Sequence, residues 1–126
     1  MARHLTAVHL NSALNRGKIV EQLLSARVVD DRWEVSWVEL WPGEKSEEGK
    51  FLVCHHFVWS QRARGMWDIT EWPSIDDTED HGEGFRQTFD DLEAAFQCIE
   101  ELGGSRTRFV NFGVIQDEVH DALGVT

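Results

Sequence analysis

The chain has 126 residues, a formal net charge of −11, 41% apolar residues and two cysteines. This length is typical of one domain, and the apolar content suffices for a core without disulfides. The negative charge argues against nucleic acid or anionic lipid as the main partner, because both are polyanions. Apolar runs fall short of the ~20 residues needed to cross a bilayer. We expect a single cytoplasmic domain over residues 1–126, with no membrane segment and two reduced thiols.

The first predicted element is a helix. Leucine and valine residues recur at near-helical spacing early in the chain, which predicts a helix over residues 12–25. Asn11, Ser12 and Asn15 are the candidate N-caps, and Gly17 interrupts the pattern.

Two strands are predicted next. Residues 32–41 alternate between apolar and polar side chains, as a strand does, but Trp33, Trp37 and Trp41 also stand at helical i, i+4 spacing. Aromatic and β-branched content favours the strand. Residues 50–59 are apolar on both faces and predict a more central strand.

The clearest helix lies between its cap, at Asp90 or Thr88, and Gly103. Asp90 or Thr88 is the expected N-cap, one apolar stripe follows, and Gly103 with Gly104 ends the helix.

The complete pattern predicts an α+β fold. Strands are expected over residues 66–72, 85–89 and 108–114, and a final short helix over residues 116–123. The element order is then α-β-β-β-β-α-β-α. Short links between strands imply an antiparallel sheet of four to five strands with the helices packed on one face.

Acidic residues are concentrated in one part of the chain. Eleven of the 23 acids lie between Glu71 and Glu101, where Arg86 is the only base, so this segment carries a charge of about −10. Five of these acids have no structural role that the pattern explains: Asp76, Asp77, Glu79, Asp80 and Glu83. A concentrated negative field attracts cations or a basic partner.

The acidic segment does not match a calcium loop. An EF-hand beginning at Asp76 would need Gly at its sixth position and Glu at its twelfth, but these are His81 and Gln87. His55 and His56 are neighbours on a predicted strand and point to opposite faces, so they cannot share one ion. We expect no metal and no cofactor.

Signatures of nucleophilic or phosphate chemistry are missing from the sequence. There is no G-x-S-x-G elbow, and the glycines near the acidic segment are flanked by acids where phosphate would need positive charge. The sequence therefore favours a protein without catalytic activity.

All six tryptophans lie within a forty-residue window. If the strands in this window are neighbours, the same-face residues Trp33, Trp37 and Trp41 exceed what one small core can bury. An exposed tryptophan anchors protein interfaces or lines a small-molecule pocket. Trp72, at the border of the acidic segment, is a candidate anchor.

The leading hypothesis is a non-enzymatic binding protein that docks a basic protein partner through Asp76, Asp77, Glu79, Asp80, Glu83 and Trp72. In composition the chain is similar to bacterial immunity and inhibitor proteins, which often present carboxylates to the cationic cleft of a basic toxin or nuclease. This likeness covers no particular stretch of sequence.

Two alternatives stay open. The first is a small-molecule-binding domain or an uncharacterised enzyme with a tryptophan-lined pocket, in which Cys54, His56 or Asp68 would be polar contacts. The second is a homo-oligomer, such as a homodimer, that buries surplus tryptophans between subunits.

Overall fold

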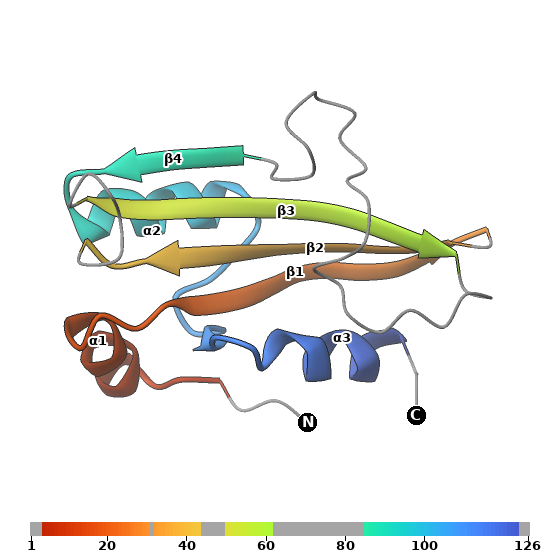
Figure 1. Ribbon diagram of the computed structural model, residues 1–126, viewed down its shortest axis with the longest axis horizontal. Helices are drawn as coiled ribbons and strands as arrows, with labels where there is room; N and C mark the ends of the chain where they lie inside the picture. Colours follow the sequence, from red (N-terminus) through yellow and green to blue (C-terminus); the bar gives the residue numbers. More distant parts are fainter. Residues whose placement is uncertain (1–3, 31, 44–49, 62–84, 124–126) are drawn as a thin grey trace.

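The fold is α+β, with three helices and a five-stranded antiparallel sheet (Figure 1). The computed structural model describes residues 4–30, 32–43, 50–61 and 85–123. The elements are α1 (Ala7–Asn15), β1 (Val20–Val29), β2 (Arg32–Trp41), β3 (Phe51–Gln61), β4 (Phe85–Phe89), α2 (Leu92–Glu101), β5 (Val110–Asn111) and α3 (Ile115–Leu123). The predicted order α-β-β-β-β-α-β-α is confirmed.

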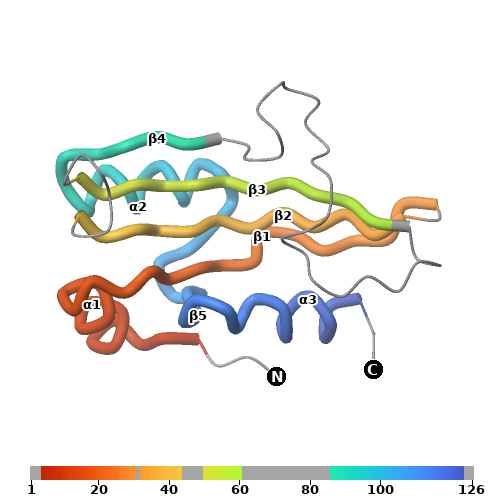
Figure 2. Tube along the Cα trace, in the orientation of Figure 1, coloured from red at the N-terminus to blue at the C-terminus, as the bar shows by residue number. Residues whose placement is uncertain are grey.

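The strands lie in the order β4-β3-β2-β1-β5, and every neighbouring pair is antiparallel. Figure 2 shows the three long strands side by side, with α1 at one end of the sheet and α3 along β1. β1 and β2 form a hairpin whose turn includes Asp30 at a φ of 55°, a left-handed conformation that Asp tolerates. The registers of these pairs decide which side chains meet.

The first quarter of the chain differs from its prediction. The helix is α1, which begins after its N-cap Thr6, and the second half of the predicted helix is the strand β1. Gly17, at a φ of 75°, ends α1. Within β1, the β1–β2 register shifts between Leu23 and Ser25, so Leu24 is the additional residue of a β-bulge and the alternation typical of a strand is interrupted.

The other elements agree more closely with their predictions. Residues 32–41 are a strand, and the strand predicted from residue 50 begins at Phe51. The strand predicted over residues 66–72 lies outside the described residues. β5 is shorter than the predicted strand over residues 108–114, because the chain turns into α3 directly after Asn111.

Helix α2 begins one residue later than predicted. Asp91, not Asp90 or Thr88, is the N-cap, and its carboxylate accepts a hydrogen bond from the Ala94 N–H at 2.8 Å. The predicted glycine stop is confirmed. Gly103, at a φ of 99°, donates to the Glu100 carbonyl, and Gly104 donates to the Ile99 carbonyl. These two bonds form a Schellman motif.

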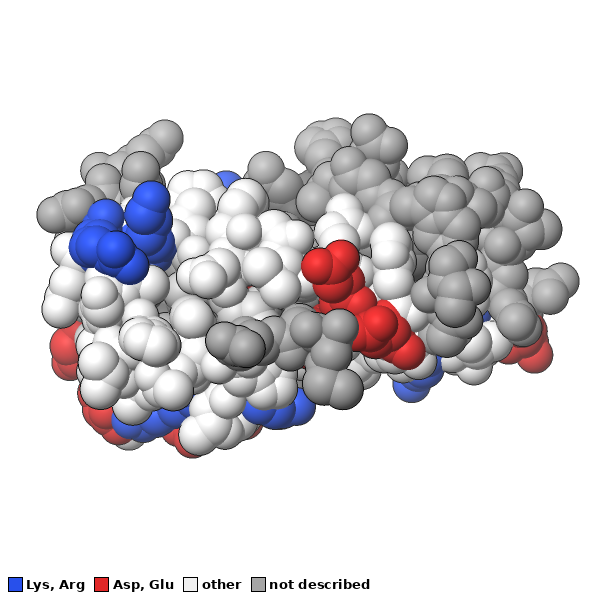
Figure 3. Space-filling model, turned by 90° about the horizontal axis from the view of Figure 1, so that it is seen from below, with Lys and Arg blue, Asp and Glu red and all other residues white. Residues whose placement is uncertain are grey.

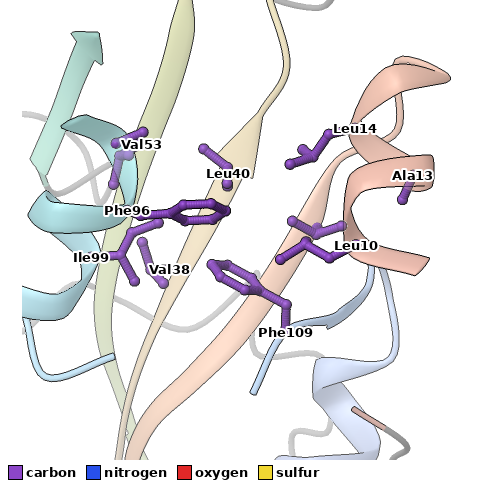
Figure 4. Close-up of a cluster of buried hydrophobic side chains, with 11 residues drawn as sticks. Leu10, Ala13, Leu14, Val38, Leu40, Val53, Phe96, Ile99 and Phe109 are labelled. Carbon is purple, nitrogen blue, oxygen red and sulfur yellow. The ribbon is translucent and has the colours of Figure 1, made fainter. Parts of the chain in front are cut away.

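One face of the sheet packs against α1 and α2, and we call it the α1–α2 face. Figure 4 shows Phe96 of α2 pointing toward Leu40 and Phe109, with Ile99 beside Val38, while Leu10 of α1 points toward Phe109. Phe109 is fully buried and lies between the two helices. Burial of apolar area in this cluster is the main stabilising contribution of this layer.

The opposite face, the α3 face, has its own core. Trp33, Val35 and Trp37 of β2 pack with Ile115 and Val119 of α3, and all five are buried. The expected arrangement of helices on one face therefore holds for α1 and α2 only. β2 is apolar on both faces, so the sheet requires a cover on each side.

Candidate functional site

A row of polar side chains crosses the α3 face of the sheet. The registers pair Glu21 of β1 with Glu39 of β2, Glu39 with Cys54 of β3, and Cys54 with Arg86 of β4. Directly paired residues of antiparallel strands project from the same face. Four consecutive strands thus place a carboxylate, a second carboxylate, a thiol and a guanidinium side by side. We call these four residues the transverse row.

Glu39 is held in place from two sides. One carboxylate oxygen accepts a hydrogen bond from the Trp41 indole N–H at 3.2 Å, and the other is bonded to Nε2 of His56. Trp37 also holds His56 in place, because the two rings stack with their centroids 4.6 Å apart and an angle of 19° between their planes. An ionised carboxylate only accepts hydrogen bonds, so Nε2–H of His56 is the donor in this pair. The orientation of both side chains is therefore set before any ligand arrives.

A hollow of about 180 Å³ lies beside this pair. Cys54, the short residue of the transverse row, lies between the longer side chains of Glu39 and Arg86. His56 follows Cys54 by two residues on β3, and Trp41 follows Glu39 by two on β2, so both project from the same face. The lining residues are these five: Glu39, Trp41, Cys54, His56 and Arg86. We call this hollow the Cys54 cleft.

Glu21, at the inner end of the transverse row, is a buried carboxylate with an altered pKa. It is 4% exposed, and burial raises its pKa from 4.5 to about 7. The Gly113 N–H, which donates to Glu21 at 3.0 Å just before α3 begins, lowers the pKa, whereas the charge of Glu39 raises it. Burial outweighs the favourable amide, so Glu21 exchanges a proton near neutral pH.

Glu34 provides a contrast on the opposite face. It is also 4% exposed, but the guanidinium of Arg32 and that of Arg27, at 2.8 Å, hold its pKa below the usual range. This carboxylate is neutralised by its neighbours and serves the β1–β2 hairpin. Glu21 and Glu39, by contrast, are paired with each other across β1 and β2.

Two larger hollows lack a comparable polar arrangement. One, of about 490 Å³, is lined mainly by neutral residues of α1 and the β2–β3 end, and the other, of about 470 Å³, contains Arg16, Lys18 and Phe112. Figure 3 shows basic side chains gathered at the α1 end of the molecule. Arg16 and Lys18 are exposed surface cations. A binding site is recognised by a few oriented polar groups in a concave surface, which favours the Cys54 cleft.

The residues that the sequence singled out fall into two groups. Cys54 and His56, named as polar contacts of a small-molecule pocket, are brought together in the Cys54 cleft. Asp68 and the predicted partner-binding residues lie outside the described residues: Trp72, Asp76, Asp77, Glu79, Asp80 and Glu83.

Of the four tryptophans in the described part of the chain, two are buried and two are half-buried. Trp33 and Trp37 are buried by α3, at 7% and 3% exposure, and Trp41 is half-buried at the cleft. The core on the α3 face was not expected from the sequence, and it buries Trp33 and Trp37, which one small core could not have held together with Trp41.

Sequence reasoning missed Glu21, Glu39 and Arg86. Glu21 lies on a strand that was predicted as helix, so its face could not be assigned. Glu39 shares the parity of Trp37 and Trp41 on β2, and Arg86 is the one base among eleven acids, so both carried a detectable signal. Glu21, Glu39 and Arg86 come together only through the pairing registers of β1 to β4. A register depends on two strands at once, so it cannot be read from one segment of the sequence.

Comparisons with protein-family models, curated proteins and solved structures found no match. Within the described ranges, no group of three or more His, Cys, Asp or Glu side chains is arranged to hold a metal ion. No helix among those described is long and apolar enough to span a membrane. The site must therefore be interpreted from its own chemistry.

Proposed function

We propose that the protein is a small-molecule-binding domain whose binding site is the Cys54 cleft. The observation that carries this proposal is the Glu39–His56 pair, fixed by Trp41 and Trp37, at the wall of a hollow. Side chains that are oriented before binding lose little freedom when a ligand arrives, which favours affinity.

The size of the cleft limits the ligand. Pockets for drug-sized molecules and cofactors usually have volumes of ~300–1,000 Å³. At about 180 Å³, the Cys54 cleft suits a molecule of few heavy atoms or a single functional group of a larger one. Dinucleotides and other large cofactors do not fit this volume.

The test is a screen of small polar molecules by two-dimensional NMR of the six tryptophan indole N–H groups. Ligands of the cleft should shift the Trp41 signal, which is assigned by Trp41→Phe. Cys54→Leu fills the hollow and should abolish binding, whereas Cys98→Leu, on α2, should preserve it. The proposal fails if no compound binds, or if compounds bind equally to the Cys54→Leu protein.

Docking of a basic protein by the acidic segment remains a second proposal. Several described acids of this region have structural roles. Asp91 caps α2, and Glu93 and Glu100 form ion pairs with Arg106. Of the eight other acids between Glu71 and Glu101, five lie in the segment Asp76 to Glu83, where the sequence predicted the docking site.

This second proposal is tested with a variant in which the five acids Asp76, Asp77, Glu79, Asp80 and Glu83 become Asn or Gln. We expect the wild-type chain to retain a basic protein from the source cell at low salt and to release it at high salt. The variant should retain none. Equal retention by both proteins would exclude the segment as the docking surface.

A further inference from the structure

We propose that the Cys54 cleft binds a small zwitterion, with its amino group at Glu39 and Trp41 and its carboxylate at Arg86. This inference rests on the proposed function, and it adds the chemical class of the ligand. It follows from the distribution of charge around the hollow, the aromatic wall and the spacing of the strands.

Opposite charges stand at the two ends of the cleft. Glu39 and Arg86 both pair with Cys54, one from each side, so they lie two strand spacings apart. Neighbouring strands are about 4.8 Å apart, which places their backbones ~10 Å from each other. Cys54 is too short to fill the space between the two longer side chains. A ligand above Cys54 therefore meets a carboxylate on one side and a guanidinium on the other.

The Glu39 end suits an ammonium group. A carboxylate next to an aromatic wall binds organic cations through charge and through the face of the ring. Glu39 keeps acceptor capacity beyond its bonds to Trp41 and His56, because a carboxylate has about four lone-pair sites. Trp41 is half-buried and lines the same hollow.

The Arg86 end suits a carboxylate. A guanidinium presents several N–H donors in a planar fork that matches the two oxygens of a carboxylate. A ligand with a single charge finds an oppositely charged side chain at one end of the cleft only. A zwitterion satisfies both ends at once, and an amino acid is small enough for about 180 Å³.

The experiment compares small probes that differ in the number and separation of their charges. Alanine, β-alanine and γ-aminobutyrate carry both charges at increasing separation, while propylamine and propionate carry one charge each. Binding is followed by the indole N–H signal of Trp41. We expect at least one zwitterion to bind tenfold or more tightly than either singly charged probe. The inference is overturned if a singly charged probe binds as tightly, or if no zwitterion binds.

Charge variants identify the role of each end. Glu39→Gln should lower zwitterion affinity tenfold or more and leave propionate unaffected or improved. Arg86→Gln should likewise lower zwitterion affinity tenfold or more, but it should leave propylamine unaffected or improved. Arg86→Lys should restore part of the zwitterion affinity. Glu101→Gln and Arg108→Gln change charges outside the cleft and serve as controls. If the ratio of zwitterion affinity to the affinity of the singly charged probes were unchanged in Glu39→Gln and Arg86→Gln, the roles assigned to the two ends would be contradicted.

The outcomes separate this inference from the proposed function. If other small molecules bind and Cys54→Leu abolishes their binding, the cleft is a binding site but zwitterions are not its ligands. If no molecule binds in the broader screen, the proposed function itself fails.

Discussion

Protonation of Glu21 should make the free energy of unfolding depend on pH, and Glu21→Gln should remove this dependence. The folded chain raises the pKa of Glu21 from 4.5 to about 7, chiefly through burial. At about 1.4 kcal/mol per pKa unit, the rise corresponds to about 3 kcal/mol. Because the folded state holds the proton more tightly, this stability is fully present below pH 4.5 and is lost as pH rises through about 7.

Glu21→Gln keeps an oxygen for the Gly113 N–H but cannot ionise. The free energy of unfolding of the variant, relative to wild type, should therefore increase by about 2–3 kcal/mol between pH 5 and pH 8. Urea unfolding followed by tryptophan fluorescence measures this difference. Glu101→Gln, on the exposed end of α2, should show no such trend. A difference between Glu21→Gln and wild type that stays constant over this range would refute the reasoning.

Three further substitutions test the fold, each by urea unfolding. Asp91→Ala removes the cap of α2 and should cost about 1 kcal/mol, whereas Asp90→Ala should cost much less, because Asp90 forms only a surface ion pair. A Cβ added at Gly104 would lie 2.8 Å from the Gln22 side-chain oxygen, so Gly104→Ala should cost about 1–3 kcal/mol. Phe109→Ala should cost about 3–5 kcal/mol, since Phe109 is fully buried. Costs near zero would contradict these placements.

Local signals predicted much of the fold. The apolar stripe and the double glycine of α2 are encoded within a dozen residues, and the structure differs there by one residue at the cap. The strand β2 was predicted against a competing helical spacing, because every second residue on a strand shares a face, and so do residues four apart.

The failure at β1 has an identifiable cause. Adjacent strand residues face opposite sides of a sheet, so Leu23 packs against the α3 core and Leu24 against the α1–α2 core, and the β-bulge at Leu24 then interrupts the alternation. Two adjacent leucines that face opposite cores produce a spacing close to that of a helix. Tertiary packing then decides that this segment is a strand, and its own sequence does not show this.

The candidate site was less predictable for the same reason. Cys54 and His56 share a face by parity alone, and the sequence named both as possible polar contacts of one pocket. Glu39 and Arg86 join them only through the registers of β2–β3 and β3–β4. Glu21 required in addition that β1 be a strand.

The transverse row is costly for a sheet, and this cost is informative. Glu21 and Glu39 are directly paired, and like charges in this position destabilise a sheet. An apolar pair would extend the α3 core toward Arg86 and would avoid burying a carboxylate with a pKa of about 7. The structure instead places the unburied part of the row at a hollow where Glu39 is held by two donors. Departures from the stablest packing are expected where binding requires them, so the row that weakens the sheet is also the best candidate for its function.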